Sequence, residues 1–202
     1  MPSPNATGDS MKKRLILAYA GFTLIELMVA VAVLGILLGL AIPQFSELIT
    51  RNRLTASTNE FIAALNLARS EAIKRGQIVV VRKTDQNWEQ GWQVFVDMDR
   101  STNAKKNVFN EGKDIELRIF DALADGFTLR GNNNFVNFIS YQPSGRSNNI
   151  GSFAMCANQD ITHSKLIVVN TTGRIRIAPD ADQDGVPEKD GGTEISSCLD
   201  GF

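Results

Sequence analysis

Residues 21–42 decide the fold and read GFTLIELMVAVAVLGILLGLAI. From Phe22 onward, this run contains a single charged side chain, Glu26. A helix of about 21 residues is roughly 31 Å long, which is enough to cross the hydrocarbon core of a bilayer. The stretch therefore predicts a transmembrane helix over residues 22–42.

The overall composition is that of a globular protein. Hydrophobic residues make up 43% and charged residues 21% of the 202 residues, which excludes disorder along the whole chain. The formal net charge of −1 conceals separate blocks, because residues 43–179 carry +4 and residues 180–202 carry −6. The net charge does not indicate a generally basic nucleic-acid binder, and any basic surface must be local.

Two ordinary interpretations of the apolar run compete with a more specific one. A secretory signal peptide is disfavoured, because the run exceeds the usual length of a signal h-region and no small-residue cleavage site follows it. A plain signal anchor does not account for Glu26, since a carboxylate inside a membrane helix is costly and usually has a partner. Lys12, Lys13 and Arg14 precede the run and favour a cytoplasmic location for that flank.

The residues around Glu26 resemble the processing motif of type IV prepilins and of the pseudopilins of type II secretion. The matching segment is Gly21-Phe22-Thr23-Leu24-Ile25-Glu26-Leu27. The resemblance implies that prepilin peptidase cuts between Gly21 and Phe22, which removes residues 1–21 as a leader, and that the new N-terminus is methylated. It also implies that Glu26 pairs with the terminal amine of a neighbouring subunit, and two charges in an apolar filament core are tolerable only when paired.

A helical pattern continues beyond Pro43 and becomes amphipathic. The apolar residues recur mostly at steps of three or four: Phe45, Leu48, Ile49, Leu54, Phe61, Ile62, Leu65, Ala68 and Ile73. Two basic residues followed by Gly76 form a helix stop. We expect one helix over Phe22–Arg75, with its amphipathic half in residues 43–76. We also expect a kink at Pro43, because proline removes a backbone donor.

Residues 77–202 are predicted to form a strand-rich domain. Short runs rich in β-forming residues alternate with turn residues. The expected strands are residues 78–82, 92–96, 115–120, 127–130, 135–140, 152–156, 166–170 and 174–178. We therefore expect an α+β fold, in which a long N-terminal spine helix packs its amphipathic half on an antiparallel β-sheet domain.

Several downstream segments resemble the GspH/FimT branch of pilin-like proteins. They are GWQVFVD at residues 91–97, PSGR at 143–146, GSFAMC at 151–156 and VVNTTGRIR at 168–176. The resemblance implies a minor pilin of the FimT/FimU kind that primes or caps a type IV pilus. It implies a single-pass protein of the bacterial inner membrane, with its globular domain in the periplasm, that later joins the filament. The implied partners are prepilin peptidase, other minor pilins and the major pilin.

Two other functions stay open at this point. A GspH-like minor pseudopilin of a type II secretion system would share the fold and the processing but would serve protein export. A membrane-anchored binding module that never enters a filament is the third hypothesis. We expect no enzyme and no small-molecule substrate, because the sequence has no nucleophile elbow, P-loop or dinucleotide motif. The single histidine, His163, is expected in a polar, solvated loop.

Cys156 and Cys198 are the two cysteines of the chain. An exported domain lies in an oxidising compartment, so the pair predicts one disulfide that closes the C-terminal tail onto the sheet. A metal site built on these cysteines is disfavoured, because the chain has one histidine and no Cys-x-x-Cys pair.

The tail alternates acidic residues before Gly185. The candidate ligands are Asp180, Asp182, Asp184 and Glu188. Oxygen ligands at this spacing suit a calcium-binding loop. The alternative, which we favour, is a solvated acidic turn without a cofactor. A second acidic group, which runs from the end of the strand expected at 92–96 into the strand expected at 115–120, is also expected to be solvated. It contains Asp97, Asp99, Asn103, Asp114 and Glu116.

The segment Gly173-Arg174-Ile175-Arg176 places two cations on one face of a strand, because alternate strand residues face the same side. Two such cations beside a turn can contact successive phosphates. In some members of the branch that this chain resembles, a Gly-Arg-x-Arg motif binds DNA during natural transformation. The match implies double-stranded DNA as a partner, with Arg146 and Lys165 extending the patch. The alternative is ordinary surface charge with Ile175 and Ile177 in the core.

Overall fold

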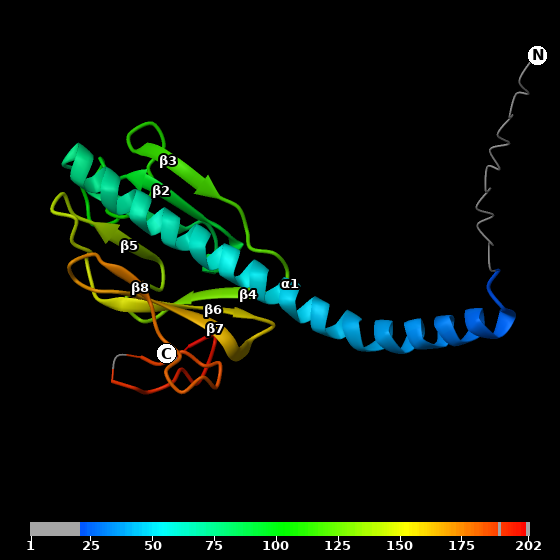
Figure 1. Ribbon diagram of the computed structural model, residues 1–202. Coiled ribbons are helices and arrows are strands. Elements are labelled where there is room, and N and C mark those ends of the chain that lie inside the picture. Colours follow the sequence, from blue (N-terminus) through cyan, green and yellow to red (C-terminus); the bar gives the residue numbers. More distant parts are fainter. Residues whose placement is uncertain (1–20, 190, 201–202) are drawn as a thin grey trace, which may run out of the picture. The chain divides into compact units, whose positions relative to one another are not determined.

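The computed structural model describes residues 21–189 and 191–200 (Figure 1). The chain divides into two compact units, Met1–Gln44 and Phe45–Phe202, and helix α1 (Leu24–Arg75) contributes residues to both. The expected leader lies outside the described residues except for Gly21. The predicted helix is confirmed, and it begins two residues later than expected.

In the first unit, α1 begins with a reciprocal cap. The backbone N–H and the hydroxyl of Thr23 each donate to Oε2 of Glu26 at 2.8 Å, and the N–H of Glu26 donates back to the Thr23 hydroxyl at 3.3 Å. This is the capping-box pattern, which satisfies donors at a helix N-terminus. The helix is continuous through Pro43, and the predicted kink there stays a prediction.

The apolar residues of this unit are exposed from Phe22 to Ile42. By length and composition, this part of α1 can cross a membrane. A secretory signal sequence would pass the same test. An uncovered apolar surface of this extent requires lipid or other apolar helices around it.

In the second unit, α1 packs on two four-stranded antiparallel sheets (Figure 1). The first sheet has the order β3 (Ile115–Phe120), β2 (Trp92–Val96), β1 (Val79–Lys83) and β5 (Phe138–Tyr141). The second has the order β4 (Phe127–Gly131), β6 (Gly151–Ala157), β7 (Asp160–Val169) and β8 (Ile175–Ile177). A short 3₁₀ helix, η1 (Trp88–Gln90), precedes β2.

Phe61 of α1 joins the helix to both sheets. Its ring meets Trp92 of β2 edge-on at 5.1 Å and Phe153 of β6 at 4.7 Å, and it also contacts Trp88 at 5.6 Å. Leu65 lies one turn further along the helix and is fully buried in the same core. Edge-to-face aromatic pairs add specific attraction to the burial of apolar area, so this cluster fixes the helix against both sheets. The α+β prediction is therefore confirmed, with two sheets in the β domain.

A second, smaller core lies on the other face of the β4-β6-β7-β8 sheet. It combines Leu166 and Val168 of β7 with Val186 and Ile195 of the C-terminal segment, which runs beside β7 in Figure 1. The disulfide Cys156–Cys198 ties this segment to β6, with 6.1 Å between the two Cα atoms. The predicted disulfide is confirmed, and the tail covers one face of the sheet.

Asn103 and Glu116 are exposed as expected, but Asp97 and Asp99, in the segment between β2 and β3, are buried and not solvated. Asp97 is buried and accepts bonds from the Arg100 guanidinium and from the N–H of Asn107, and burial raises the pKa of the Asp97 carboxyl. Asp99 accepts a bond from the Lys105 ammonium at 2.9 Å, and this bond and the Ser101 hydroxyl lower the pKa of Asp99 to about 2. The carboxylates are turned inward because they satisfy the donors of their own loop.

Candidate functional site

The predicted processing and assembly residues lie at the start of α1. Gly21 and Phe22 precede the helix and are exposed, and the space around the Gly21 Cα is open. Glu26 lies one turn beyond Phe22, with its carboxylate directed back to the cap at Thr23. This geometry brings an anionic group close to the chain end that a cut after Gly21 would create. The cut itself and the pairing of Glu26 stay predictions.

The two arginines of the Gly-Arg-x-Arg segment lie at the edge strand β8. Both are exposed, and Arg176 stands opposite Val168 in the pairing of β8 with β7. Arg174 immediately precedes β8, and the two arginines line one cavity of about 250 Å³ together with Asn170. The structure thus brings Arg174 and Arg176 together as expected. Ile177 is 44% exposed and does not lie in the core, whereas Ile175 packs against the main core, as the alternative of ordinary surface charge expected.

Lys165 does not extend this surface as expected. It pairs with Met155, which lies in the main core beneath α1, whereas Arg176 pairs with Val168 of the smaller core on the opposite face. Because side chains alternate along a strand, positions 165 and 168 of β7 face opposite sides of the sheet. The sequence did not reveal this difference, because it depends on the register between strands.

Arg146 lies in the turn that follows β5. It is exposed, and its carbonyl accepts a bond from the N–H of Gln142 at 2.8 Å, which closes the turn. The hydroxyl of Ser147 donates to the carbonyl of Asn170 at 2.9 Å, so this turn is joined to the turn that leads into Arg174. The two arginine-bearing turns are therefore neighbours, although a stretch of the chain that includes β6 and β7 separates them.

Arg69 of α1, which was not among the predicted site residues, bonds to both of these turns. Its Nε donates to the carbonyl of Gly145 at 3.0 Å, and one of its terminal nitrogens donates to the carbonyl of Thr172 at 3.2 Å. Arg69 follows Leu65 by four residues and Phe61 by eight, so it continues the buried stripe of the helix. A basic residue in an apolar stripe was the signal that could have revealed it.

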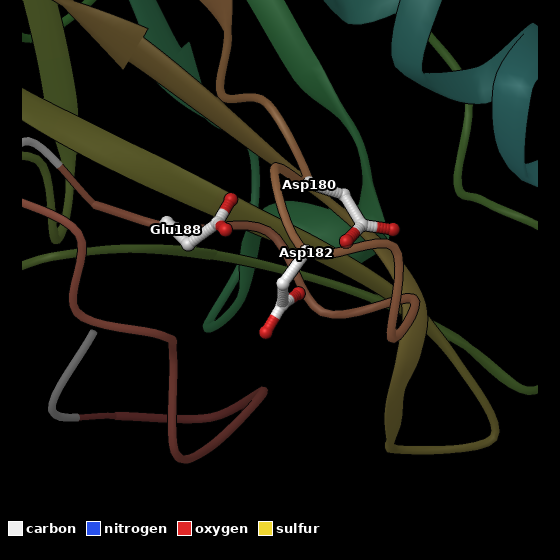
Figure 2. A group of neighbouring side chains, drawn as sticks. All are labelled: Asp180, Asp182 and Glu188. Carbon is white, nitrogen blue, oxygen red and sulfur yellow. The ribbon is translucent and has the colours of Figure 1, made fainter.

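The acidic tail brings the predicted calcium ligands into two groups rather than one. Asp180, Asp182 and Glu188 form the first group, with carboxylate oxygens within 4.8 Å of one another (Figure 2). Asp184 belongs to a second group with Asp182 and Glu194, and Glu194 was not among the predicted ligands.

The tail carboxylates already accept bonds from their own loop. Glu188 is buried and accepts a bond from the N–H of Ala181 at 2.8 Å, while Asp180 accepts one from the N–H of Gly185 at 3.0 Å. The negative charges of the neighbouring aspartates, Asp184 above all, raise the pKa of Glu194. Carboxylate oxygens suit calcium, and a calcium loop here stays a prediction beside the solvated turn.

His163 lies in β7 and not in the polar loop that was expected. It is half-buried, adopts φ = 67°, and its N–H donates to the carbonyl of Gly185 at 2.5 Å. The strand extends to Asp160 because β6 and β7 continue their pairing up to Ala157 and Asp160, where a tight turn follows. The imidazole therefore lies next to the tail.

Comparison with known protein families identifies two segments of the chain. Residues 57–173 match the family described as "Type II transport protein GspH", and residues 17–42 match the "Prokaryotic N-terminal methylation motif". The GspH match covers more than half of the 202 residues and ends at Gly173, immediately before the two arginines of the candidate surface. The methylation-motif match includes Gly21 and Glu26.

Relatives and solved structures agree with this assignment. A "Fimbrial protein" of Pseudomonas aeruginosa is 33% identical over 117 residues, which is 56% of this chain and 75% of the relative. The type IV minor pilin FimU of Pseudomonas aeruginosa superposes with a TM-score of 0.54 at 22% identity, over 73% of this chain and 96% of FimU. A second crystal form of FimU gives a TM-score of 0.51 at 20% identity, over 71% of this chain and 98% of FimU.

The likeness to FimU concerns the fold, while the sequence matches establish the family. The methylation motif implies processing by prepilin peptidase and other pilins as partners, and the apolar helix agrees with membrane anchoring and association with a pilus or pseudopilus. The chain belongs to the GspH/FimT family of type IV pilin-like proteins.

Proposed function

We propose that the chain is a minor pilin of a type IV pilus that primes filament assembly and stays at or near the tip. The observation that carries this proposal is the fully exposed apolar part of α1, which precedes a β domain with a closed core of its own. Such a helix can be accommodated in a lipid bilayer and also among the apolar helices of other pilins. Transfer from one environment to the other is the step that assembly requires.

Glu26 gives this transfer its specificity. Both bonds from Thr23 end on Oε2 of Glu26, so Oε1 can accept a bond from an incoming N-terminal amine. In an apolar environment an unpaired carboxylate is strongly disfavoured, and an ion pair with a neighbouring subunit removes much of that cost. The capping bonds hold the carboxylate in place before the neighbour arrives.

A pseudopilin of a type II secretion system is the alternative within the same family, and it is favoured by the description of the matching family. A strain that lacks the chain separates the two functions. The pilus proposal predicts few or no surface pili by electron microscopy and unchanged amounts of exported proteins in the medium. Normal piliation combined with a loss of protein export would refute the pilus proposal and establish the alternative.

We further propose that the β8 edge contacts DNA. The supporting observation is that Arg174 and Arg176 are exposed and line one cavity at a sheet edge. Each phosphate contact that is lost should reduce the slope of log affinity against log salt by about 0.9.

The test exchanges Arg174 and Arg176 for Gln and measures binding of double-stranded DNA over a series of salt concentrations. The double variant should bind more weakly at low salt and show a shallower slope. Arg53→Gln is the matched control, because Arg53 is an exposed arginine on α1 that lies in none of the described contacts with the two turns. An unchanged affinity and slope in the double variant would refute the DNA contact.

A further inference from the structure

Arg69 is a charged residue at a core-facing position of α1. Ala68 and Ala72 on either side are fully buried, while Arg69 itself is half-buried. Taking a guanidinium out of water is costly unless its donors find acceptors. The acceptors here are two backbone carbonyls, those of Gly145 and Thr172, at 3.0 and 3.2 Å.

Each of these carbonyls belongs to a turn that ends in an exposed arginine. In the first turn, the N–H of Gly145 donates to the carbonyl of Gln142 at 2.7 Å, and Arg146 follows directly. In the second turn, the N–H of Gly173 donates to the carbonyl of Asn170 at 2.9 Å, and Arg174 follows directly. The acceptors of Arg69 therefore lie one and two residues before the surface arginines.

The two turns touch each other beside the Arg69 guanidinium. A Cβ atom added at Gly173 would lie 2.1 Å from the carbonyl oxygen of Gly145 and 3.0 Å from Nε of Arg69. Gly173 has φ = 75°, a left-handed conformation that glycine adopts without strain. The contact leaves no room for a side chain at position 173. The Arg69 guanidinium lies beside this contact and bonds to a carbonyl of each turn.

We propose that Arg69 is a positioning residue for the surface formed by Arg146, Arg174 and Arg176. By bonding to both turns, Arg69 sets the position of Arg146 relative to Arg174. This inference rests on the proposed DNA contact. Two donors of Arg69, Nε–H and one terminal N–H, end on carbonyls of the protein, so its proposed role is to support the turns and not to contact phosphate. A planar guanidinium can donate along two directions at once, whereas the ammonium of lysine is a point charge. Arg69→Lys therefore keeps the positive charge but loses the simultaneous bonds to both turns.

The experiment uses the full processed chain in detergent micelles and compares Arg69→Lys with the wild type. Hydrogen exchange measured by NMR reports the stability of the two turns directly, because the amides of Gly145 and Gly173 donate the bonds that close them. We expect both amides to exchange at least about tenfold faster in the variant, because each turn loses a hydrogen bond from a charged donor. Arg53→Lys on the exposed side of the helix should leave both amides unchanged.

Binding of a double-stranded oligonucleotide between about 50 and 200 mM salt completes the test. We expect Arg69→Lys and Arg69→Gln to weaken binding by a similar factor with the salt slope of the wild type, whereas Arg174→Gln should lower the slope. Weaker binding with a reduced slope in Arg69→Gln alone would identify Arg69 as a phosphate contact and overturn the proposal.

Two other results would also overturn it: unchanged exchange at both turns, or faster exchange with wild-type DNA binding. If the wild-type chain fails to bind DNA, the proposed DNA contact is refuted, and with it the functional role of Arg69. The exchange measurement would still show whether Arg69 holds the turns, so the two failures are distinguishable.

Discussion

Removal of the disulfide should destabilise the whole β domain. Cys156 and Cys198 are separated by 42 residues. A loop of this length gives a loss of chain entropy in the unfolded state that is worth about 4 kcal/mol. Both cysteines are buried, and the tail that they anchor covers Leu166 and Val168. The cost should therefore reach the core and not only the tail.

The assay is urea unfolding of residues 45–202, which form a compact unit that holds all the buried residues described. Trp88 and Trp92 lie in the main core and report its unfolding by fluorescence. With an m-value of about 2 kcal/mol/M, the double variant Cys156→Ala/Cys198→Ala should unfold at a urea concentration about 2 M lower. Leu199→Ala is the control, because Leu199 is exposed in the same tail. A shift below about 0.5 M would refute the coupling between tail and core.

Three further outcomes follow from the structure. Phe61→Ala should cost about 3–5 kcal/mol of unfolding free energy by urea titration, because it empties the centre of the aromatic cluster; a cost below about 1 kcal/mol would contradict that role. The pKa of Asp99 is lowered to about 2, so its contribution to stability is present above its ordinary value of 3.8 and is lost as the pH falls toward 2. Asp99→Asn should therefore lower stability at pH 7 and lose this effect near pH 2, and an equal effect at both pH values would refute the assignment. Removal of calcium with EGTA should leave the unfolding midpoint unchanged if the tail is a solvated turn, because the disulfide holds it; a lower midpoint that Asp182→Asn abolishes would identify a calcium loop.

The helix and most strand positions could be predicted because their signals are local. The apolar period and the basic stop before Gly76 placed the end of α1, and the runs at Trp92–Val96 and Ile115–Phe120 were placed without error. The division into two sheets could not be predicted, because it depends on which strands meet across the chain. Phe61 contacts both sheets, through Trp92 of one and Phe153 of the other.

The candidate surface was predictable only in part for the same reason. Arg174 and Arg176 are two residues apart, so strand alternation was enough to bring them together. Lys165 required the register of β7 with β6, and Arg69 required the contact between two turns that are remote in sequence. The sequence predicts a solvated Asp97 because an acidic residue in a loop usually is, whereas in the structure its partners come from its own loop.

The entry of the chain into a pilus through Glu26 is tested most directly by comparing sheared surface pili with the membrane fraction. Glu26→Gln keeps a side chain that can complete the cap at Thr23 but removes the charge, whereas Glu26→Ala removes both. We predict that the wild type is found in sheared pili, while both variants are processed normally and remain in the membrane fraction. Glu26→Gln in sheared pili at the wild-type ratio to the major pilin would contradict assembly through the charge of Glu26.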